Sequence, residues 1–343
     1  MQHSEGIRGT QGQGLAEQDS PGERSSITEL RQKAEAGDAS AQNLLGVHYG
    51  DGRGGVTKSD VEAVKWYRRS AEAGLPMAMR NLAVMYEEGR GVAKDVKEAV
   101  AWYSKAAERG VVSAKVSLAF HYWSGKHIAK NLDEAGRLFR EAAVAGDRSA
   151  QLMYGHVLKN GTPTIAKNEQ ESIGWYRRAA EGGDAWGQYW LASALLRSVA
   201  RDTPHKEGLI WMARAAEQGL PQAHMFLGQV FELGYHGTAT NTVQAVSHYR
   251  AGASKGFAEA QYEYALAHFE GTGGLSKNPK EGARWLRLAA EQGYAIAQYF
   301  YAIVLENGNG VDKNLPEARK WYAAAAEKGH SAAQAALTRI DLK

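Results

Sequence analysis

The chain has 343 residues, and its 41 basic and 38 acidic side chains leave a formal net charge of +3. Such a small net charge does not indicate binding of nucleic acid or of a membrane surface through bulk electrostatics. Cysteine is absent, which excludes disulfide bonds, thiolate metal sites and cysteine nucleophiles. No stretch approaches the ~20 consecutive apolar residues that a membrane-spanning helix needs.

The first 25 residues are rich in Gly, Gln, Ser and charged side chains and contain almost no large apolar ones. Such a segment buries too little apolar surface to offset the entropy of ordering, so we expect a disordered tail over residues 1–25. A helix is expected over 26–36, where Ser26 and Glu29 have the spacing of a capping box. The N-terminus lacks the basic and apolar regions of a signal peptide, which predicts a cytoplasmic protein, or a periplasmic or secreted one if a leader was removed.

From residue 37 onward, glycines recur every 36 or 37 residues and divide the chain into eight units. Each unit predicts two amphipathic helices joined by a Gly-rich loop, because apolar residues follow a helical period on either side of that loop. A hairpin this small cannot bury both of its helices, so each unit needs its neighbours. The boundary glycines are Gly37, Gly74, Gly110, Gly146, Gly183, Gly219, Gly256, Gly293 and Gly329.

Three further features repeat with the same period. A small residue lies four places after every boundary glycine, which predicts a close crossing of two helices. Capping boxes of the kind formed by Asp95 and Glu98 precede the second helices. Those helices carry Trp66, Trp102, Trp175, Trp211, Trp285 and Trp321, with Leu138 and His248 at the matching places of units three and six. Unit five is irregular, since its loop from Arg197 to Gly208 lacks paired glycines. A lone helix over 330–341 is expected to close the array.

In unit one these features read Ala41, Leu45, Gly46, Tyr49, Gly52, Gly54, Glu62, Ala63, Trp66, Tyr67, Ala71 and Gly74. This order resembles the Sel-one-like repeat family, a longer-period relative of the tetratricopeptide repeat. The resemblance implies an all-α, right-handed superhelical solenoid, here a single one over residues 26–341 with capping half-repeats at 26–36 and 330–341. It also implies a non-catalytic adaptor or scaffold. Bacterial members occur in host interaction, envelope biogenesis and toxin–immunity systems.

The first helices carry a second face opposite their packing stripe. At about 100° per residue, this face takes places 3, 6, 10 and 13 after each boundary glycine. Because related stacks turn this face into their concave surface, the resemblance predicts a partner-binding groove, although the same side chains can instead complete the packing between units. The predicted contact residues are Arg80, Glu87, Phe120, Trp123, Trp186, Tyr189, Met225, Tyr262, Phe269 and Tyr299.

Acidic residues accompany this face, which favours a protein or peptide partner that is apolar with some basic character. These residues are Glu87, Glu232, Glu259, Glu270 and Glu306. Two other functions stay open: a dedicated inhibitor or immunity-type protein that clamps a toxin or an enzyme, and an envelope protein that binds carbohydrate or peptidoglycan. The sequence leaves the oligomeric state open.

An enzyme is the least favoured function, because no catalytic motif occurs in the sequence. The glycines of Gly89-Arg90-Gly91 are not followed by Gly-Lys-Ser/Thr, so they indicate a helix-ending loop rather than a phosphate site. His121 and His156 have no third ligand at short spacing, and we therefore expect no metal and no other cofactor. His205, beside Lys206 and Glu207 in the irregular loop, is expected to be solvated.

Overall fold

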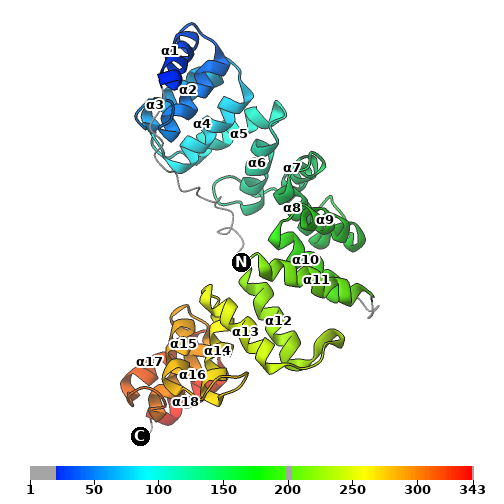
Figure 1. Ribbon diagram of the computed structural model, residues 1–343, viewed down its shortest axis with the longest axis vertical. Coiled ribbons are helices and arrows are strands. Elements are labelled where there is room, and N and C mark those ends of the chain that lie inside the picture. The colour runs from blue at the N-terminus through cyan, green and yellow to red at the C-terminus, as the bar shows by residue number, and fades with distance from the viewer. Residues whose placement is uncertain (1–20, 198–202, 342–343) are drawn as a thin grey trace. The chain divides into compact units, whose positions relative to one another are not determined.

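The computed structural model describes residues 21–197 and 203–341, and these residues form helices and connecting loops without any strand (Figure 1). The expected tail at 1–25 lies outside the described residues up to residue 20, and residues 21–25 belong to the first turns of helix α1, Pro21–Glu35. This helix therefore begins five residues before the expected start at Ser26. A break in the contacts separates two compact units, Met1–Ala150 with Thr162–Ala166 and Gln151–Gly161 with Lys167–Lys343. A single solenoid over 26–341 stays a prediction.

Each repeat contributes one pair of helices. The first helices are α2 (Ala39–Asp51), α4 (Pro76–Glu88), α6 (Val112–Ser124), α8 (Arg148–Asn160), α10 (Ala185–Leu196), α12 (Pro221–Leu233), α14 (Ala258–Glu270) and α16 (Ala295–Asn307). The second helices are α3 (Asp60–Glu72), α5 (Val96–Glu108), α7 (Leu132–Val144), α9 (Glu169–Glu181), α11 (Thr203–Glu217), α13 (Thr242–Ser254), α15 (Pro279–Glu291) and α17 (Leu315–Glu327). Helix α18 (Ser331–Asp341) ends the described chain, and a short 3-10 helix, η1 (Tyr235–Gly237), follows α12.

The predicted caps of the second helices are present. The Asp95 side chain accepts a hydrogen bond from the backbone N–H of Glu98 at 3.0 Å, and Asn131 accepts one from Glu134 at the same distance. The same contact recurs at Ser59, Asn168, Asn241, Asn278 and Asn314. Each bond satisfies a backbone donor that the first helical turn leaves without a partner, which is why the second helices begin where the sequence predicts.

Close helix crossings hold the repeats together. The small residue four places after the boundary glycine is fully buried at Ala78, Ala114 and Ala260. Unit five needs glycine there, because a Cβ on Gly187 would lie 2.7 Å from the Cβ of Ala179 on α9. Contacts this close exclude any larger side chain, and within each compact unit they fix how a first helix lies on the second helix before it.

The tryptophans of the second helices form a covered outer layer. In Trp102 and Trp175 the indole N–H donates to the glutamate one turn earlier, Glu98 and Glu171, at 2.9 and 3.4 Å. Basic side chains lie over these indole rings, and examples are Arg69 over Trp66, Lys105 over Trp102 and Arg178 over Trp175. Basic residues of the second helices are thus used within the fold, as expected for a mixed-charge outer face.

The two glycines of the loop after α4 are required for different reasons, one for its backbone conformation and the other for a close approach to the preceding helix. Substitution by alanine should therefore not be equally destabilising at every glycine. Gly89 ends α4 in the left-handed region, with φ +73°. Gly91 approaches the preceding second helix so closely that a Cβ would lie 2.1 Å from the carbonyl oxygen of Asp60. At Gly74, where φ is also positive, an added Cβ would have no neighbour within 4 Å.

We therefore expect Gly91→Ala to lower the free energy of unfolding by about 1–3 kcal/mol more than Gly74→Ala does, because only the former adds an overlap to the backbone strain that both share. Urea unfolding followed by circular dichroism measures the difference. Equal losses in the two variants would show that the loop does not depend on this close approach.

Candidate binding surface and cavity

All ten side chains predicted to contact a partner lie on first helices, and each is half-buried. They come from α4, α6, α10, α12, α14 and α16. Half-burial is what a side chain needs in order to be held in position and still touch another molecule. Their role in binding stays a prediction.

In the first compact unit, most of these side chains are engaged by their neighbours. Phe120 and Trp123 both pack edge-on against Phe139 of α7, with ring centroids 5.1 and 6.3 Å apart. Glu87 accepts a hydrogen bond from the Tyr103 hydroxyl at 2.7 Å and lies 3.3 Å from Nε2 of His121. The bond to His121 is the main reason that the pKa of Glu87 is lowered.

Arg80 donates from Nη1 to the side-chain oxygen of Asn81, whereas its Nε is buried without a hydrogen-bond partner. The two polar residues of the predicted contact set, Arg80 and Glu87, therefore already bind neighbouring side chains. Glu87 in particular already has two internal partners, so its carboxylate is less available to an incoming cation than an exposed one.

In the second compact unit, four aromatic residues of the predicted face, Trp186, Tyr189, Tyr262 and Tyr299, belong to two groups of contacting rings. In one group, Trp186 contacts Tyr189 at 5.7 Å, Tyr189 contacts Trp190 at 5.5 Å, and Trp190 contacts His156 at 4.9 Å. The Nζ of Lys159 lies 4.5 Å from the centre of the Trp190 ring. Trp186 and Tyr189 also pack on the buried core around Leu191. They are thus both packing residues and surface residues.

The other group includes Tyr262, Phe300 and Tyr299. The ring of Phe300 lies 5.6 Å from that of Tyr262 and 5.4 Å from that of Tyr299. His330 stacks on Tyr299 at 4.5 Å. Met225 and Phe269 pack on the edges of neighbouring core clusters.

The face predicted from the sequence does not include the residues seven places after the boundary glycines, which are Trp190, Phe226, Glu263 and Phe300. A signal for them exists, because place 7 lies only about 40° around the helix from place 3. The predicted face was drawn too narrowly, and place 7 borders both the packing stripe and the open face. Trp190 contacts both Tyr189 and His156, and Phe300 contacts both Tyr262 and Tyr299.

The acidic residues of this face differ in their partners. Glu232 accepts from the Tyr249 hydroxyl at 2.6 Å, and Glu306 accepts from Tyr322 at 2.8 Å and from Arg339 at 2.6 Å. Glu263, on α14, is half-buried, and burial together with the nearby charges of Glu232 and Glu270 raises its pKa to about 7. Glu263 is therefore the carboxyl group of this face that has most to gain from a cation.

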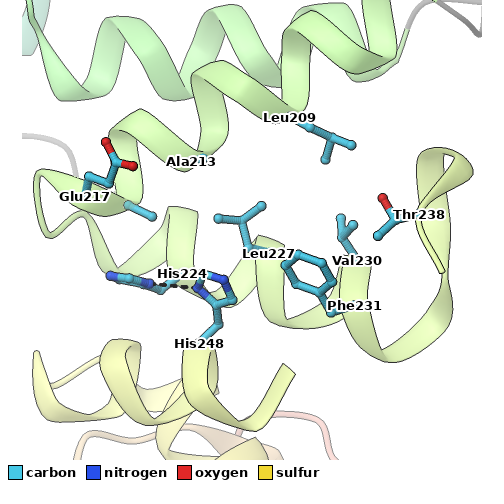
Figure 2. Close-up of a pocket in the computed structure, with 10 residues that line it drawn as sticks. Leu209, Ala213, Glu217, His224, Leu227, Val230, Phe231, Thr238 and His248 are labelled. Carbon is cyan, nitrogen blue, oxygen red and sulfur yellow. Dashed lines mark hydrogen bonds between the residues drawn. The ribbon is translucent and has the colours of Figure 1, made fainter. Parts of the chain in front are cut away.

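A cavity of about 270 Å³ lies between α11, α12 and α13 in the second compact unit (Figure 2). Its walls are mainly apolar and include Leu209, Ala213, Leu227, Val230 and Phe231. The side chains of His224 and His248 lie at one end, and Figure 2 shows the hydrogen bond between their Nδ1 atoms, 3.1 Å apart. His248 occupies the place that tryptophan takes in six of the eight units.

Both imidazoles are poor bases. Burial lowers the pKa of His248 to about 4, and His224 adds to this effect. The pKa of His224 is lowered as well, mainly by burial, and Lys255 contributes. One of the two Nδ1 atoms must carry a proton and donate it in the hydrogen bond, and the other must accept. Protonation of the accepting Nδ1 would therefore replace the hydrogen bond with a repulsive contact between two N–H groups.

A larger cavity of about 970 Å³ shares Leu209, Val230 and Thr238 with the first and extends toward η1. His236 of η1 has a φ of +56°. Its ring packs edge-on against His205 at 4.8 Å. The expectation that His205 is solvated is wrong: its side chain is buried. The reason is that α11 begins at Thr203, so His205 lies in the first turn of a helix and its ring packs against His236 of η1.

In residues 21–197 and 203–341, no three His, Asp or Glu side chains are grouped so that they could hold a metal ion. Over the same residues, no helix combines the length and the apolar character that crossing a membrane requires.

Helix pairs of nearly constant length that pack in succession define an α-helical repeat protein of the solenoid class. The family model of the Sel1 repeat matches eight consecutive segments, residues 39–75, 76–111, 112–147, 148–184, 187–220, 221–257, 258–294 and 295–330. The chain therefore belongs to the Sel1 repeat family.

Solved structures agree with this assignment. A Sel1 repeat protein from Oxalobacter formigenes is 27% identical, with a TM-score of 0.72 and 98% of each chain covered. A protective antigen with an SLR fold, present in uropathogenic Escherichia coli strains, is 28% identical, with a TM-score of 0.59 over 93% of this chain and 75% of that one. An uncharacterized protein of Neisseria meningitidis serogroup B is 34% identical over 97 residues, which are 28% of this chain and 20% of that protein. The match thus spans about a fifth of that relative.

The histidine pair predicts a loss of stability in acid. The pKa of His248 is about 4 in the folded protein, whereas a free histidine has a pKa of 6.5, so the unfolded chain binds the proton more tightly between these values. The free energy of unfolding should therefore fall as the pH drops from about 6.5 to about 4. In His248→Trp, which restores the residue of the other units, we expect a smaller fall, measured by thermal unfolding at a series of pH values. If the melting temperature depended on pH equally in both proteins, His248 would not be the group that destabilises the fold in acid.

Glu263 predicts the opposite trend at higher pH. Its folded pKa of about 7 lies above the value of 4.5 for a free glutamate, so stability falls as the pH rises through this range. We expect Glu263→Gln to raise the melting temperature at pH 8 and to leave it nearly unchanged at pH 4.5. Glu259→Gln, on the same helix, serves as the control. A gain at pH 8 that is no larger than the control's would show that Glu263 is adequately solvated.

Proposed function

We propose that this protein is a non-catalytic scaffold or adaptor that holds a segment of a partner protein against the open face of its first helices. The observation that carries the proposal is the series of half-buried aromatic side chains on that face, with Trp186, Tyr189, Tyr262 and Tyr299 as anchors. Aromatic anchors of this kind dominate the binding energy of many interfaces. Sel1 repeat proteins typically mediate protein–protein interaction, which supports the same function.

The chemistry of the face favours a partner segment that is apolar and carries basic side chains. In the part of the chain that the structure describes, the carboxylates of Glu263 and Glu270 make no ion pair, and Glu263 is held half-buried beside Glu232. A Lys or Arg side chain placed here would relieve the repulsion between the carboxylates while its neighbours contact the aromatic rings. The second compact unit is the better candidate, because in the first unit Phe120, Trp123 and Glu87 are engaged internally.

Affinity capture with surface variants tests this function. A double variant, Trp186→Ala with Tyr189→Ala, should lose a partner that the wild-type protein retains from native extract. The matched control is Ile210→Ala with Val243→Ala, which removes exposed apolar side chains from second helices instead. Once the partner is purified, we expect the aromatic variant to bind at least about thirtyfold more weakly, as the loss of a hot spot implies, and the control to bind like the wild type.

Because Trp186 and Tyr189 also pack on the core, binding is compared at a temperature at which circular dichroism shows all three proteins folded. Two results would contradict this function. If all three proteins retain the partner equally, binding does not use this face. A stoichiometric complex with a toxin or an enzyme whose activity it blocks would identify the inhibitor function instead.

A further inference from the structure

The cavity between α11, α12 and α13 lies where another repeat places an indole ring. In unit one, Trp66 packs with Ile27 and Leu45 in one apolar cluster. Ile27 lies ten residues before the boundary glycine Gly37, and Leu45 lies eight after it. Ile27, Leu45 and the tryptophan thus belong to one apolar cluster at this place of the repeat.

The counterparts in unit six line the cavity. Leu209 lies ten residues before the boundary glycine Gly219, Leu227 lies eight after it, and His248 takes the place of the tryptophan. All three side chains belong to the cavity wall. The space that the indole fills in unit one therefore corresponds to the cavity in unit six.

Ring volume is lost on the side of the second helix, where His248 replaces the tryptophan, whereas Leu227 matches Leu45 of unit one. In units seven and eight, the tryptophan packs edge-on against a tyrosine, with 5.4 Å between Tyr264 and Trp285 and 5.7 Å between Tyr301 and Trp321. Unit six has Leu227 and His248 at the two places. A leucine facing an imidazole fills less space than a leucine or a tyrosine facing an indole, and in unit six a cavity lies at this place.

We propose that this cavity binds a small planar aromatic ligand, about the size of indole, that carries one N–H or O–H donor. Its volume of about 270 Å³ exceeds the ~150 Å³ that accommodates benzene in an apolar engineered cavity. Phe231 and His248, which both line the cavity, stack on each other nearly parallel, 5.6 Å apart with 7° between the ring planes, so aromatic rings form part of its wall. This ligand site is independent of the partner-binding face.

The polar side chains at one end of the cavity favour a ligand that donates a hydrogen bond. In other repeats the indole N–H donates to a glutamate one turn earlier, as Trp211 does to Glu207 at 3.2 Å. In unit six the cavity itself includes Glu217, on the side of the histidine pair (Figure 2). The carboxylate oxygens of Glu217 and the unprotonated nitrogen of a neutral imidazole accept hydrogen bonds, whereas a carboxylate on the ligand would be repelled by Glu217.

Isothermal titration calorimetry of indole against the full chain tests the site. We expect saturable 1:1 binding to the wild-type protein and at least tenfold weaker binding to His248→Trp, in which the chain's own indole fills the cavity. His127→Trp makes the same substitution at an exposed place and should bind like the wild type. Should His248→Trp fail to fold, Ala213→Leu narrows the cavity from the wall of α11 and should weaken binding as well.

The ligand's donor is tested with 1-methylindole, which has the same ring and no N–H. We expect it to bind about three- to tenfold more weakly than indole, as the loss of one hydrogen bond implies. Equal binding of the two compounds would overturn the assigned polar contact. The absence of saturable indole binding to the wild-type protein, or equal binding to His248→Trp, would overturn the site.

Discussion

The close crossing of helices at one small residue per repeat is the constraint on which the structure depends. At Ala78 and Ala260 no side-chain surface is left exposed, and at Gly187 not even a Cβ fits. Because this contact recurs every 36 or 37 residues, the first helices within each compact unit are set in the same way on the second helices that precede them in that unit. The aromatic residues of the open face and the tryptophans of the outer layer then occupy equivalent places in successive repeats. A one-dimensional stack of this kind distributes its stability over neighbouring contacts.

Features that depend on local chemistry were predictable from the sequence. The Asn and Asp caps act on backbone groups three residues away, and the loop glycines adopt positive φ within their own turn, so a single repeat contains the whole signal. Because the signal occurs in eight copies, the helix pairs and the repeat family could both be predicted from the sequence. The start of α1 at Pro21 and the early start of α11 at Thr203 lie in the two segments without a repeat counterpart, and there the sequence offers no such guide.

The candidate sites depend on contacts between elements, and the sequence indicates these only in part. Helical period places Trp186 and Tyr189 on the open face, but it does not show that Trp190 and His156 extend the same group. Nor does it show that Glu87 is paired with His121 and Tyr103, because that pairing joins three helices. A charge counted in the sequence is available to a partner only when the fold leaves it unpaired, as it does for Glu263 and not for Glu306.

In a repeat protein, the departures from the repeat carry the most information about function. Six of the eight units keep tryptophan in the second helix, and the indole, buried or half-buried, adds apolar packing to the repeat that contains it. Unit six has instead a histidine that burial keeps neutral, beside a second histidine and an open cavity. Each of these changes lowers stability, and stacking of identical repeats requires none of them. A site that accepts a ligand accounts for all three changes together, because the ligand restores the lost packing when it binds.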